Sequence, residues 1–226
     1  MGELKPSATL ALNARVRKLK AEGKKIIDLG IGEPDFDTPI AVKNAGKKAI
    51  DENKSHYTPS GGTMELKKAV CAKFKRENKL DYPTDCVMAS NGAKQVLYNL
   101  FMATLSAGDE VIILLPYWFT YADQIKLAGG KPVFVKSKAD FQPDLQKIRA
   151  AVTDRTKMIV LNSPSNPCGV VYSREALLEI GELACEKKLL IASDEVYEKI
   201  VYPPAVHYSI AALDKQFFER TITINA

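Results

Sequence analysis

The feature that most constrains the fold of this chain is a regular alternation of short apolar runs with amphipathic stretches between residues 86 and 224. The apolar runs have the length of strands and lie at residues 86–89, 111–115, 133–135, 158–161, 189–192 and 221–224. The stretches between them place apolar residues at helical spacing over 92–105, 120–127, 144–152 and 173–188. Such an alternation over roughly 140 residues predicts an α/β fold, with a mostly parallel sheet and helices on both faces.

The residues before this region have a more helical pattern. Apolar spacing predicts a helix over 10–20 that Gly23 ends, and a later helix over 66–74. Between them, Thr38 is a candidate cap and Pro39 a candidate first residue for a helix that runs to about residue 53. Residues 26–29 form a short apolar run, which predicts a strand, and residues 57–62 form a loop rich in Gly, Pro and Ser.

Composition excludes several classes of protein. The chain has 226 residues, 46% hydrophobic and 26% charged, which is typical of a globular protein with a substantial core. Its net charge of +5 comes from lysines scattered among glutamates, which indicates a solvated surface and no nucleic-acid partner. The longest apolar run, at residues 111–119, is too short to cross a membrane. Four dispersed cysteines without a CxxC pair indicate reduced thiols and a cytoplasmic protein.

Common catalytic motifs are missing from the sequence. It has no HExxH, GxSxG or GxxxxGK[ST] pattern, which argues against a zinc protease, an α/β-hydrolase and a P-loop NTPase. Gly30 and Gly32 begin like a dinucleotide fingerprint, but Asp35 stands where the third glycine belongs, and Pro34 marks a turn. A nicotinamide-dependent oxidoreductase therefore remains an alternative that rests on the α/β pattern alone.

Ligands of parallel sheets bind beyond the carboxyl ends of the strands, so the residues that follow each apolar run are candidates for a site. After residues 86–89 the chain continues Gly92-Ala93-Lys94 into a helix, whose free N–H groups suit a phosphate, although many helices begin this way without binding anything. After residues 111–115 comes Trp118, the only tryptophan, which could stack on a flat ring or belong to the core.

The last two strand ends carry polar groups. Asn166 follows residues 158–161 in a proline-rich loop that would hold its amide in place, or form an ordinary turn. Asp194 follows residues 189–192, and a carboxylate there needs a cationic partner because burial of an unpaired charge is costly. Tyr197 lies one helical turn further on. Together these positions describe a ligand with a phosphate, a flat ring, a ring nitrogen that takes a proton and a ring hydroxyl, which is pyridoxal phosphate.

At this point the sequence resembles a known family, the class I aminotransferases with the aspartate aminotransferase fold, and among them the prokaryotic aspartate aminotransferases. The resemblance rests on motifs that occur in family order along the chain. They lie at residues 5–9 (KPSAT), 30–39 (GIGEPDFDTP), 57–62 (YTPSGG), 90–95 (SNGAKQ), 116–118 (PYW), 162–169 (NSPSNPCG) and 193–197 (SDEVY).

The resemblance implies a role for each matching position. Gly92, Ala93 and Lys94 match the segment that binds the cofactor phosphate, and Trp118 matches the aromatic side chain that stacks on the pyridine ring. Asn166 and Tyr197 match the residues that hydrogen-bond the ring oxygen, and Asp194 matches the partner of the pyridine nitrogen. Gly32, together with Trp118 and Asn166, matches substrate-contacting positions. Tyr57 matches a tyrosine that reaches the phosphate of the neighbouring subunit, which implies a homodimer.

The resemblance also implies a domain order and a departure from the family. Residues 1–40 correspond to an N-terminal arm with a small-domain segment, and residues 41–226 to a truncated large domain that binds the cofactor. The family's catalytic lysine follows a strand like 221–224 by a few residues, and this sequence stops at Asn225-Ala226, so no catalytic residue is assigned. The expected reaction of a full-length enzyme is amino transfer from aspartate to 2-oxoglutarate. The alternative is a non-catalytic or split-enzyme subunit that binds the cofactor or a partner chain.

Overall fold

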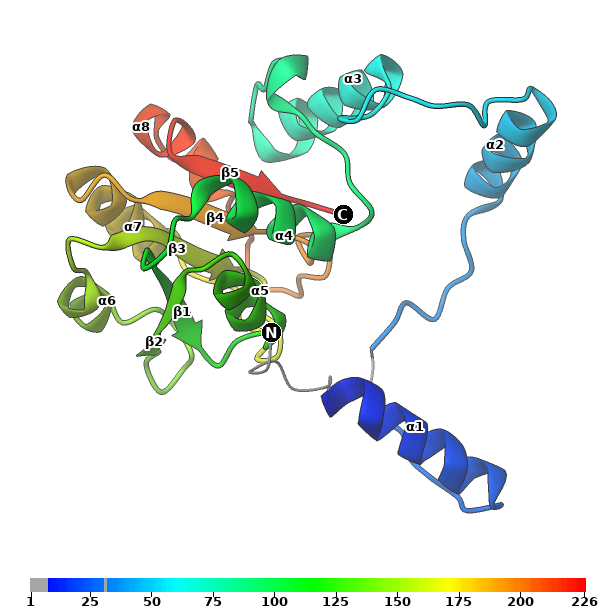
Figure 1. Ribbon diagram of the computed structural model, residues 1–226, viewed down its shortest axis with the longest axis horizontal. Coiled ribbons are helices and arrows are strands. Elements are labelled where there is room, and N and C mark those ends of the chain that lie inside the picture. Colours follow the sequence, from blue (N-terminus) through cyan, green and yellow to red (C-terminus); the bar gives the residue numbers. More distant parts are fainter. Residues whose placement is uncertain (1–7, 31) are drawn as a thin grey trace. The chain divides into compact units, whose positions relative to one another are not determined.

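The computed structural model describes residues 8–30 and 32–226, which form two compact units. The first unit ends at Thr58 and contains the helices α1 (Ala8–Ala21) and α2 (Ile40–Asp51) (Figure 1). Pro39 occupies the N-cap position of α2, and no side chain caps this helix, so the predicted roles of Thr38 and Pro39 are wrong by one residue. The expected division at residue 40 concerns the domains of a complete relative and stays a prediction.

The strand predicted at residues 26–29 does not form. Ile27 and Leu29 are 91% and 92% exposed, and the backbone there has no regular structure. A strand is stable when a neighbouring strand satisfies its N–H and C=O groups, and none of the described residues pairs with this run. The apolar composition of the run was therefore a misleading signal.

The second unit, Pro59–Ala226, begins with α3 (Met64–Lys73), whose first turn is capped by the Thr63 hydroxyl. A π-helical turn at Phe74–Asn78 and a short 3-10 turn at Thr84–Cys86 follow. The chain is then extended, but the strand predicted at residues 86–89 is absent. Its backbone is tied to the rest of the described chain by the Ala89 N–H, which donates to the Gly61 carbonyl oxygen at 3.0 Å.

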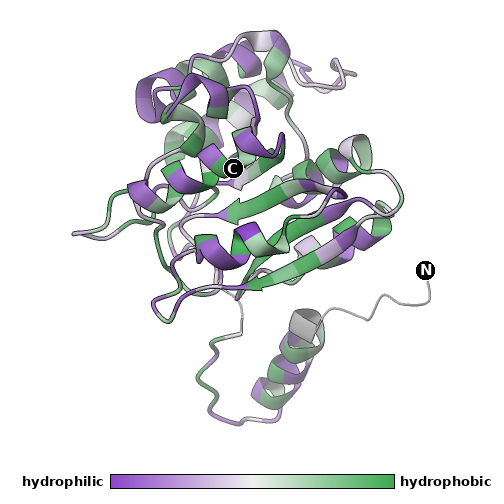
Figure 2. Ribbon diagram, turned by 90° about the vertical axis from the view of Figure 1, so that its left-hand side faces the viewer, coloured by the Kyte–Doolittle hydropathy of each residue, from purple (hydrophilic) through white to green (hydrophobic). Residues whose placement is uncertain are grey.

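The core of the second unit is a sheet of five parallel strands in the order β2-β1-β3-β4-β5. The strands span Glu110–Leu115 (β1), Lys131–Lys136 (β2), Thr156–Asn162 (β3), Leu190–Asp194 (β4) and Thr221–Ile224 (β5). Each of the five was predicted from its apolar run, and the structure confirms the parallel sheet. Hydrophobic strands fill the interior of this unit in Figure 2.

Helices cover both faces of the sheet, as predicted. One face packs against α4 (Ala93–Thr104) and α5 (Thr120–Leu127) through Leu97, Phe101 and Ile125. The other packs against α6 (Leu145–Ala151) and α7 (Arg174–Glu186), with the short α8 (Lys215–Phe218) beside α7. Ser173 caps α7 by accepting a hydrogen bond from the Ala176 N–H at 3.1 Å, as its sequence position predicted. No helix among the described residues is long and apolar enough to cross a membrane.

A large apolar groove runs beside β5, the strand at one edge of the sheet. Its volume is about 920 Å³, and its walls are β5, the extended residues 86–90 and parts of α3 and α4. Met88 lies in this groove and is 57% exposed. We call it the β5 groove. The unpaired edge of β5 and the unpaired run at 86–89 therefore face the same space.

Candidate functional site

The candidate site lies at the carboxyl end of the sheet, where β1, β3 and β4 end. We call this end the strand-end edge, as distinct from β5, which is the outermost strand on one side. Asn162, the last residue of β3, lies opposite Asp194, the last residue of β4, in the parallel register. The Asn162 side-chain amide donates to the Asp194 carbonyl oxygen at 3.1 Å and thereby ties the two strand ends together. Beyond β1 the chain turns through Pro116 into the aromatic residues that lead to α5.

Asp194 is the buried charge of this edge. It is 5% exposed, and one of its oxygens, Oδ2, accepts a short hydrogen bond from the Tyr121 hydroxyl. The other, Oδ1, accepts a bond from the Val196 N–H at 3.3 Å. Burial raises the pKa of Asp194 above its ordinary value, and the Tyr121 hydrogen bond offsets part of that rise. Among the described residues, no lysine or arginine forms an ion pair with it. The carboxylate is therefore well suited to a cationic group of a ligand.

Trp118 connects Asp194 with the start of α4. Its ring meets the edge of the Tyr121 ring at a centroid distance of 5.4 Å, and the Lys94 Nζ lies 5.2 Å from the centroid of Trp118. The helices α5 and α4 are also linked directly, because the Gln124 side-chain amide on α5 donates to the Lys94 carbonyl oxygen on α4 at 2.8 Å. The Lys94 ammonium, the Trp118 ring, the Tyr121 phenol and the Asp194 carboxylate are thus neighbours in that order.

The first turn of α4 has the geometry of an anion site. Gly92 precedes the helix with a φ of +80°, a conformation that favours glycine, so the chain can enter the helix sharply. The Asn91 N–H is satisfied by the Gln95 side chain at 2.9 Å. The Gln95 N–H already donates to the Gly92 carbonyl oxygen at 3.0 Å. The N–H groups of the first two helical residues, Ala93 and Lys94, have no carbonyl one turn earlier and are directed toward the space before the helix.

Asn166 and Tyr197 come together from separate loops. The Asn166 side-chain amide donates to the Tyr197 hydroxyl oxygen at 3.4 Å, and the Asn166 N–H donates to the Asn162 Oδ1 at 2.7 Å. These contacts hold the Asn166 and Tyr197 side chains together beyond the carboxyl ends of β3 and β4, where both could hydrogen-bond to the ring hydroxyl of a ligand.

The structure brings seven of the nine predicted site residues to this edge. They are Gly92, Ala93, Lys94, Trp118, Asn166, Asp194 and Tyr197. Gly32 and Tyr57 belong to the first compact unit, where both are exposed. The ligand contacts assigned to all nine stay predictions.

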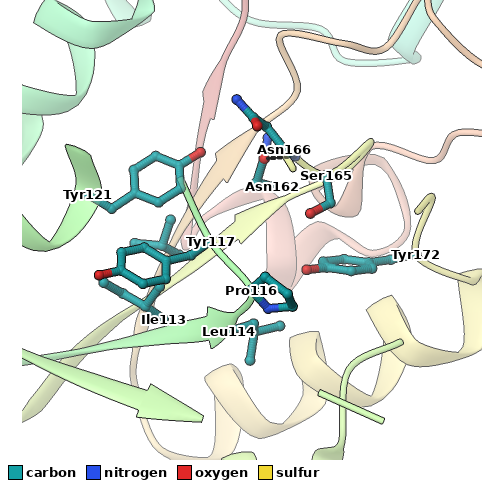
Figure 3. Close-up of a pocket in the computed structure, with 10 residues that line it drawn as sticks. Ile113, Leu114, Pro116, Tyr117, Tyr121, Asn162, Ser165, Asn166 and Tyr172 are labelled. Atoms are coloured by element: carbon teal, nitrogen blue, oxygen red, sulfur yellow. Dashed lines mark hydrogen bonds between the residues drawn. The ribbon is translucent and has the colours of Figure 1, made fainter. Parts of the chain in front are cut away.

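Two contributors were missed by the sequence analysis. Tyr121 lies on the buried face of α5, three residues after Trp118, and its polar hydroxyl at a core position was a usable signal. Asn162 ends an apolar strand and likewise needed a partner. Both line a small cavity of about 10 Å³ below the site, close to the size of one water molecule, together with Asn166 and Tyr172 (Figure 3).

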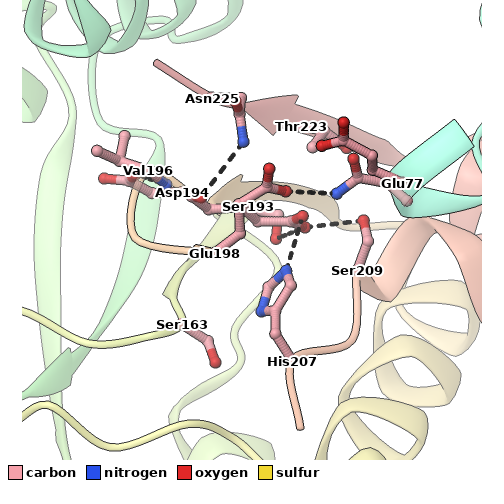
Figure 4. Close-up of polar contacts among 12 residues, drawn as sticks. Glu77, Ser163, Ser193, Asp194, Val196, Glu198, His207, Ser209, Thr223 and Asn225 are labelled. Carbon is pink, nitrogen blue, oxygen red and sulfur yellow. Dashed lines mark hydrogen bonds and ion pairs between the residues drawn. The ribbon is translucent and has the colours of Figure 1, made fainter. Parts of the chain in front are cut away.

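Behind Asp194, Glu195 is the centre of a polar cluster. The Ser193 and Ser209 hydroxyls donate to its Oε1 at 2.8 and 2.9 Å, and the His207 Nε2 lies 3.2 Å from its Oε2 (Figure 4). Glu195 itself is 1% exposed. The cluster therefore anchors the loop after β4 to the loop that precedes α8.

Glu198 extends this cluster toward α3. It is paired with Lys73 and accepts a hydrogen bond from the Asn78 amide at 2.6 Å. Glu195, Glu198 and His207 place oxygen and nitrogen atoms within 4.8 Å of one another, as a metal site would. Because the carboxylates of Glu195 and Glu198 are already hydrogen-bonded, we assign the cluster a structural role.

Comparison with known proteins gives a consistent picture. The family described as aminotransferase class I and II matches residues 24–223. An aspartate aminotransferase of Bacillus sp. strain YM-2 is 46% identical over 98% of this chain, and a probable aspartate/prephenate aminotransferase of Thermus aquaticus is also 46% identical over 98%. The chain spans 57% of the length of each of these relatives.

Solved structures show the same fold. An aspartate aminotransferase from Thermus thermophilus with maleate superposes with a TM-score of 0.94 at 42% identity, over 98% of this chain and 58% of that one. An alanine aminotransferase from Pyrococcus furiosus superposes with a TM-score of 0.90 at 35% identity, over 97% of this chain and 56% of that one. The five-stranded parallel sheet is therefore the aspartate aminotransferase fold, as predicted.

Proposed function

The chain belongs to the class I and II aminotransferases, and from that premise we propose that its strand-end site binds pyridoxal 5′-phosphate for the transfer of amino groups. The observation that carries the proposal is Asp194, a buried carboxylate without a cationic partner among the described residues. It lies within reach of the Tyr121–Trp118 aromatic pair, so the same edge offers a charge and a ring surface.

The side chains of the site fit the parts of this cofactor. The start of α4, at Gly92, Ala93 and Lys94, would hold the phosphate, and Trp118 would stack on the ring. Asp194 would pair with the ring nitrogen, while the adjacent Asn166 and Tyr197 would bind the ring oxygen. When bound, the cofactor supplies an electron sink for the carbanion formed from an amino acid, and a protonated ring nitrogen strengthens it.

The proposed substrates are an amino acid and a 2-oxo acid. The relatives' names favour aspartate, and the family resemblance implies 2-oxoglutarate as its partner. Gly32, Trp118 and Asn166 would contact the substrate. Tyr57, which is fully exposed in the first unit, would reach the phosphate of a second subunit in a cytoplasmic homodimer. The chain spans about 57% of the length of these relatives. The resemblance assigns none of the lysines in these 226 residues to catalysis, so the expectation for them by themselves is no turnover. An aspartate and 2-oxoglutarate assay of the purified chain tests this expectation.

Cofactor binding is tested most directly with pyridoxamine 5′-phosphate, whose amine does not react with surface lysines. Trp118 is the only tryptophan, so quenching of its fluorescence reports binding at this edge. We expect the Asp194→Asn variant to bind 10- to 100-fold more weakly, since a charged hydrogen bond contributes roughly 1.5–3 kcal/mol. The matched control is Asp154→Asn. Asp154 is exposed and precedes β3, so it lies at the amino end of the strands, away from the site.

Two results would contradict the proposal. One is wild-type chain whose Trp118 fluorescence does not respond to the ligand at millimolar concentration. The other is an equal loss of affinity in the Asp194 and Asp154 variants, which would show that the buried carboxylate has no special part in binding. Competition by inorganic phosphate should be the same in all three proteins, because the start of α4 is unchanged.

A second candidate is a cofactor-binding subunit that another polypeptide completes, and the β5 groove favours it because it is apolar and open. Co-expression with the part of the Bacillus sp. relative that this chain does not span tests the idea. A stable complex that catalyses transamination would support it, and two chains that purify separately would count against it.

A further inference from the structure

Among the described residues, Tyr121 is the side chain that donates a hydrogen bond to the Asp194 carboxylate. Its hydroxyl, carried by α5, donates to the Asp194 Oδ2. Both groups are buried, with 2% of Tyr121 and 5% of Asp194 exposed. The contact therefore lies in a region from which bulk water is largely excluded.

The Tyr121 ring is held so that its hydroxyl cannot easily turn elsewhere. Its edge packs against the Trp118 ring at an interplanar angle of 84°, and it belongs to the core cluster that contains Ile113 and Val160. Gln124, one turn later on α5, fixes the helix to α4 through the Lys94 carbonyl oxygen. The Trp118 ring, the core cluster and the fixed position of α5 together set the direction of the hydroxyl.

This arrangement has an electrostatic consequence for Asp194. A hydrogen bond donated to a carboxylate stabilises its charged form, whereas burial destabilises that form. Burial raises the pKa of Asp194, and the Tyr121 hydroxyl counteracts the rise. Burial and the neighbouring Asp194 carboxylate also raise the pKa of Tyr121, so the phenol stays protonated and remains a donor.

Other groups around the pair must be considered before a pH dependence is assigned to it. The loop after β4 contributes the Glu195 carboxylate and the Tyr197 phenol, and α4 contributes the Lys94 ammonium over Trp118. The residues after β3 contribute the Tyr172 phenol. Asn162 from β3 and Asn225 after β5 are neutral amides. Of the side chains in this set, Tyr121 is the one that donates to the Asp194 carboxylate.

We propose that Tyr121 is a positioning residue for Asp194, whose hydroxyl orients the carboxylate and keeps it charged so that it can pair with a cationic ligand nitrogen. The identity of that ligand rests on the proposed function, whereas the effect of Tyr121 on the carboxylate does not. The matched control is Tyr172, another buried tyrosine that lines the same small cavity but has no bond to Asp194.

The first test needs no ligand. The chain is labelled with ¹³C at aspartate carboxyl carbons, and the Asp194 signal is assigned by its loss in Asp194→Asn. We expect Tyr121→Phe to move the Asp194 titration midpoint upward by about one to two pH units, and Tyr172→Phe to leave it in place. An unmoved midpoint in a folded Tyr121→Phe chain would overturn the proposal.

A second variant covers the case in which Tyr121→Phe does not fold. Placing 3-fluorotyrosine at position 121 preserves the packing and makes the phenol a stronger donor, so the Asp194 midpoint should fall. A midpoint that stays or rises would overturn the proposal as well.

The ligand experiment then separates this inference from the proposed function. Pyridoxamine 5′-phosphate affinity, followed by Trp118 fluorescence, should weaken on the acid side at a higher pH in Tyr121→Phe than in wild type. An equal loss at every pH would indicate a packing role alone and count against the proposal. If no protein binds this ligand, the proposed function fails, while the Asp194 titration still decides the role of Tyr121.

Discussion

At some positions the packing leaves no room for a larger side chain, and Gly181 on α7 is one of them. An added Cβ would lie 2.6 Å from the Phe217 Cδ2 and Cζ atoms of α8, closer than real side-chain contacts allow. Phe217 is itself buried in the core cluster on this face of the sheet. The absence of a side chain at Gly181 is therefore what lets α8 pack against α7.

We expect Gly181→Ala to lower the free energy of unfolding by about 1–3 kcal/mol, because the Phe217 ring must shift to admit the methyl group. Urea unfolding followed by Trp118 fluorescence measures the change. The control is Gly46→Ala on α2, where an added Cβ meets nothing within 4 Å, so this variant should unfold with unchanged stability or be up to about 1 kcal/mol more stable, because alanine favours the helix over glycine. Equal stability of the two variants would show that the α7–α8 contact is looser than described.

At the scale of elements, charged side chains in loops form ion pairs and hydrogen bonds with segments far apart in the sequence. Glu198, four residues after Asp194, pairs with Lys73 at the end of α3 and with Asn78 in the following turn. Burial raises the pKa of Glu198, but the bonds from Lys73 and Asn78 outweigh it, so the pKa lies below the ordinary 4.5. The contact therefore stabilises the folded chain at pH values above about 4.5 and is lost as the pH falls through the lowered pKa.

Glu198→Gln should accordingly cost about 1–3 kcal/mol at pH 7, because the Lys73 ammonium loses its charged partner. The difference from wild type should shrink as the pH falls below 4.5, where the wild-type carboxyl becomes protonated. Thermal unfolding at pH 7 and at several values below 4.5 measures this, with Glu182→Gln at an exposed position on α7 as the control. A difference that is constant across this range would rule out the ion pair as its cause.

At the scale of the whole molecule, the β5 groove opens the core of the second unit to solvent. It exposes apolar residues of β5, α3 and α4 beside an unpaired strand edge, and such surfaces bind apolar dyes and partner chains. Its volume of about 920 Å³ is far larger than that of the small cavity below the candidate site.

The native chain should therefore enhance the fluorescence of the dye 8-anilinonaphthalene-1-sulfonate. Met88→Glu, which places a charge inside the groove, should reduce that fluorescence clearly. Met102→Glu serves as the control, because Met102 is 50% exposed on α4 but does not line the groove. An equal reduction by both variants would show that the dye binds elsewhere.

The sequence alone was sufficient to predict those elements whose formation depends on local pattern and on the residues at their ends. The five sheet strands are apolar runs bounded by turns, and Ser173 and the apolar spacing after it define α7, so local pattern and final structure agree. Four site residues, Trp118, Asn166, Asp194 and Tyr197, were also predicted to meet, because parallel strands necessarily bring their carboxyl ends to one edge.

Only the tertiary structure decided the rest, because it depended on partners distant in the sequence. Residues 26–29 and 86–89 look like strands, but a strand forms only when another strand pairs with it. Likewise, no local pattern shows that the Tyr121 hydroxyl reaches Asp194 across the edge of the sheet, 73 residues away in the chain. The sequence therefore determined which chemistry is present, and the packing of α5 against the sheet decided which of its groups act on the buried carboxylate.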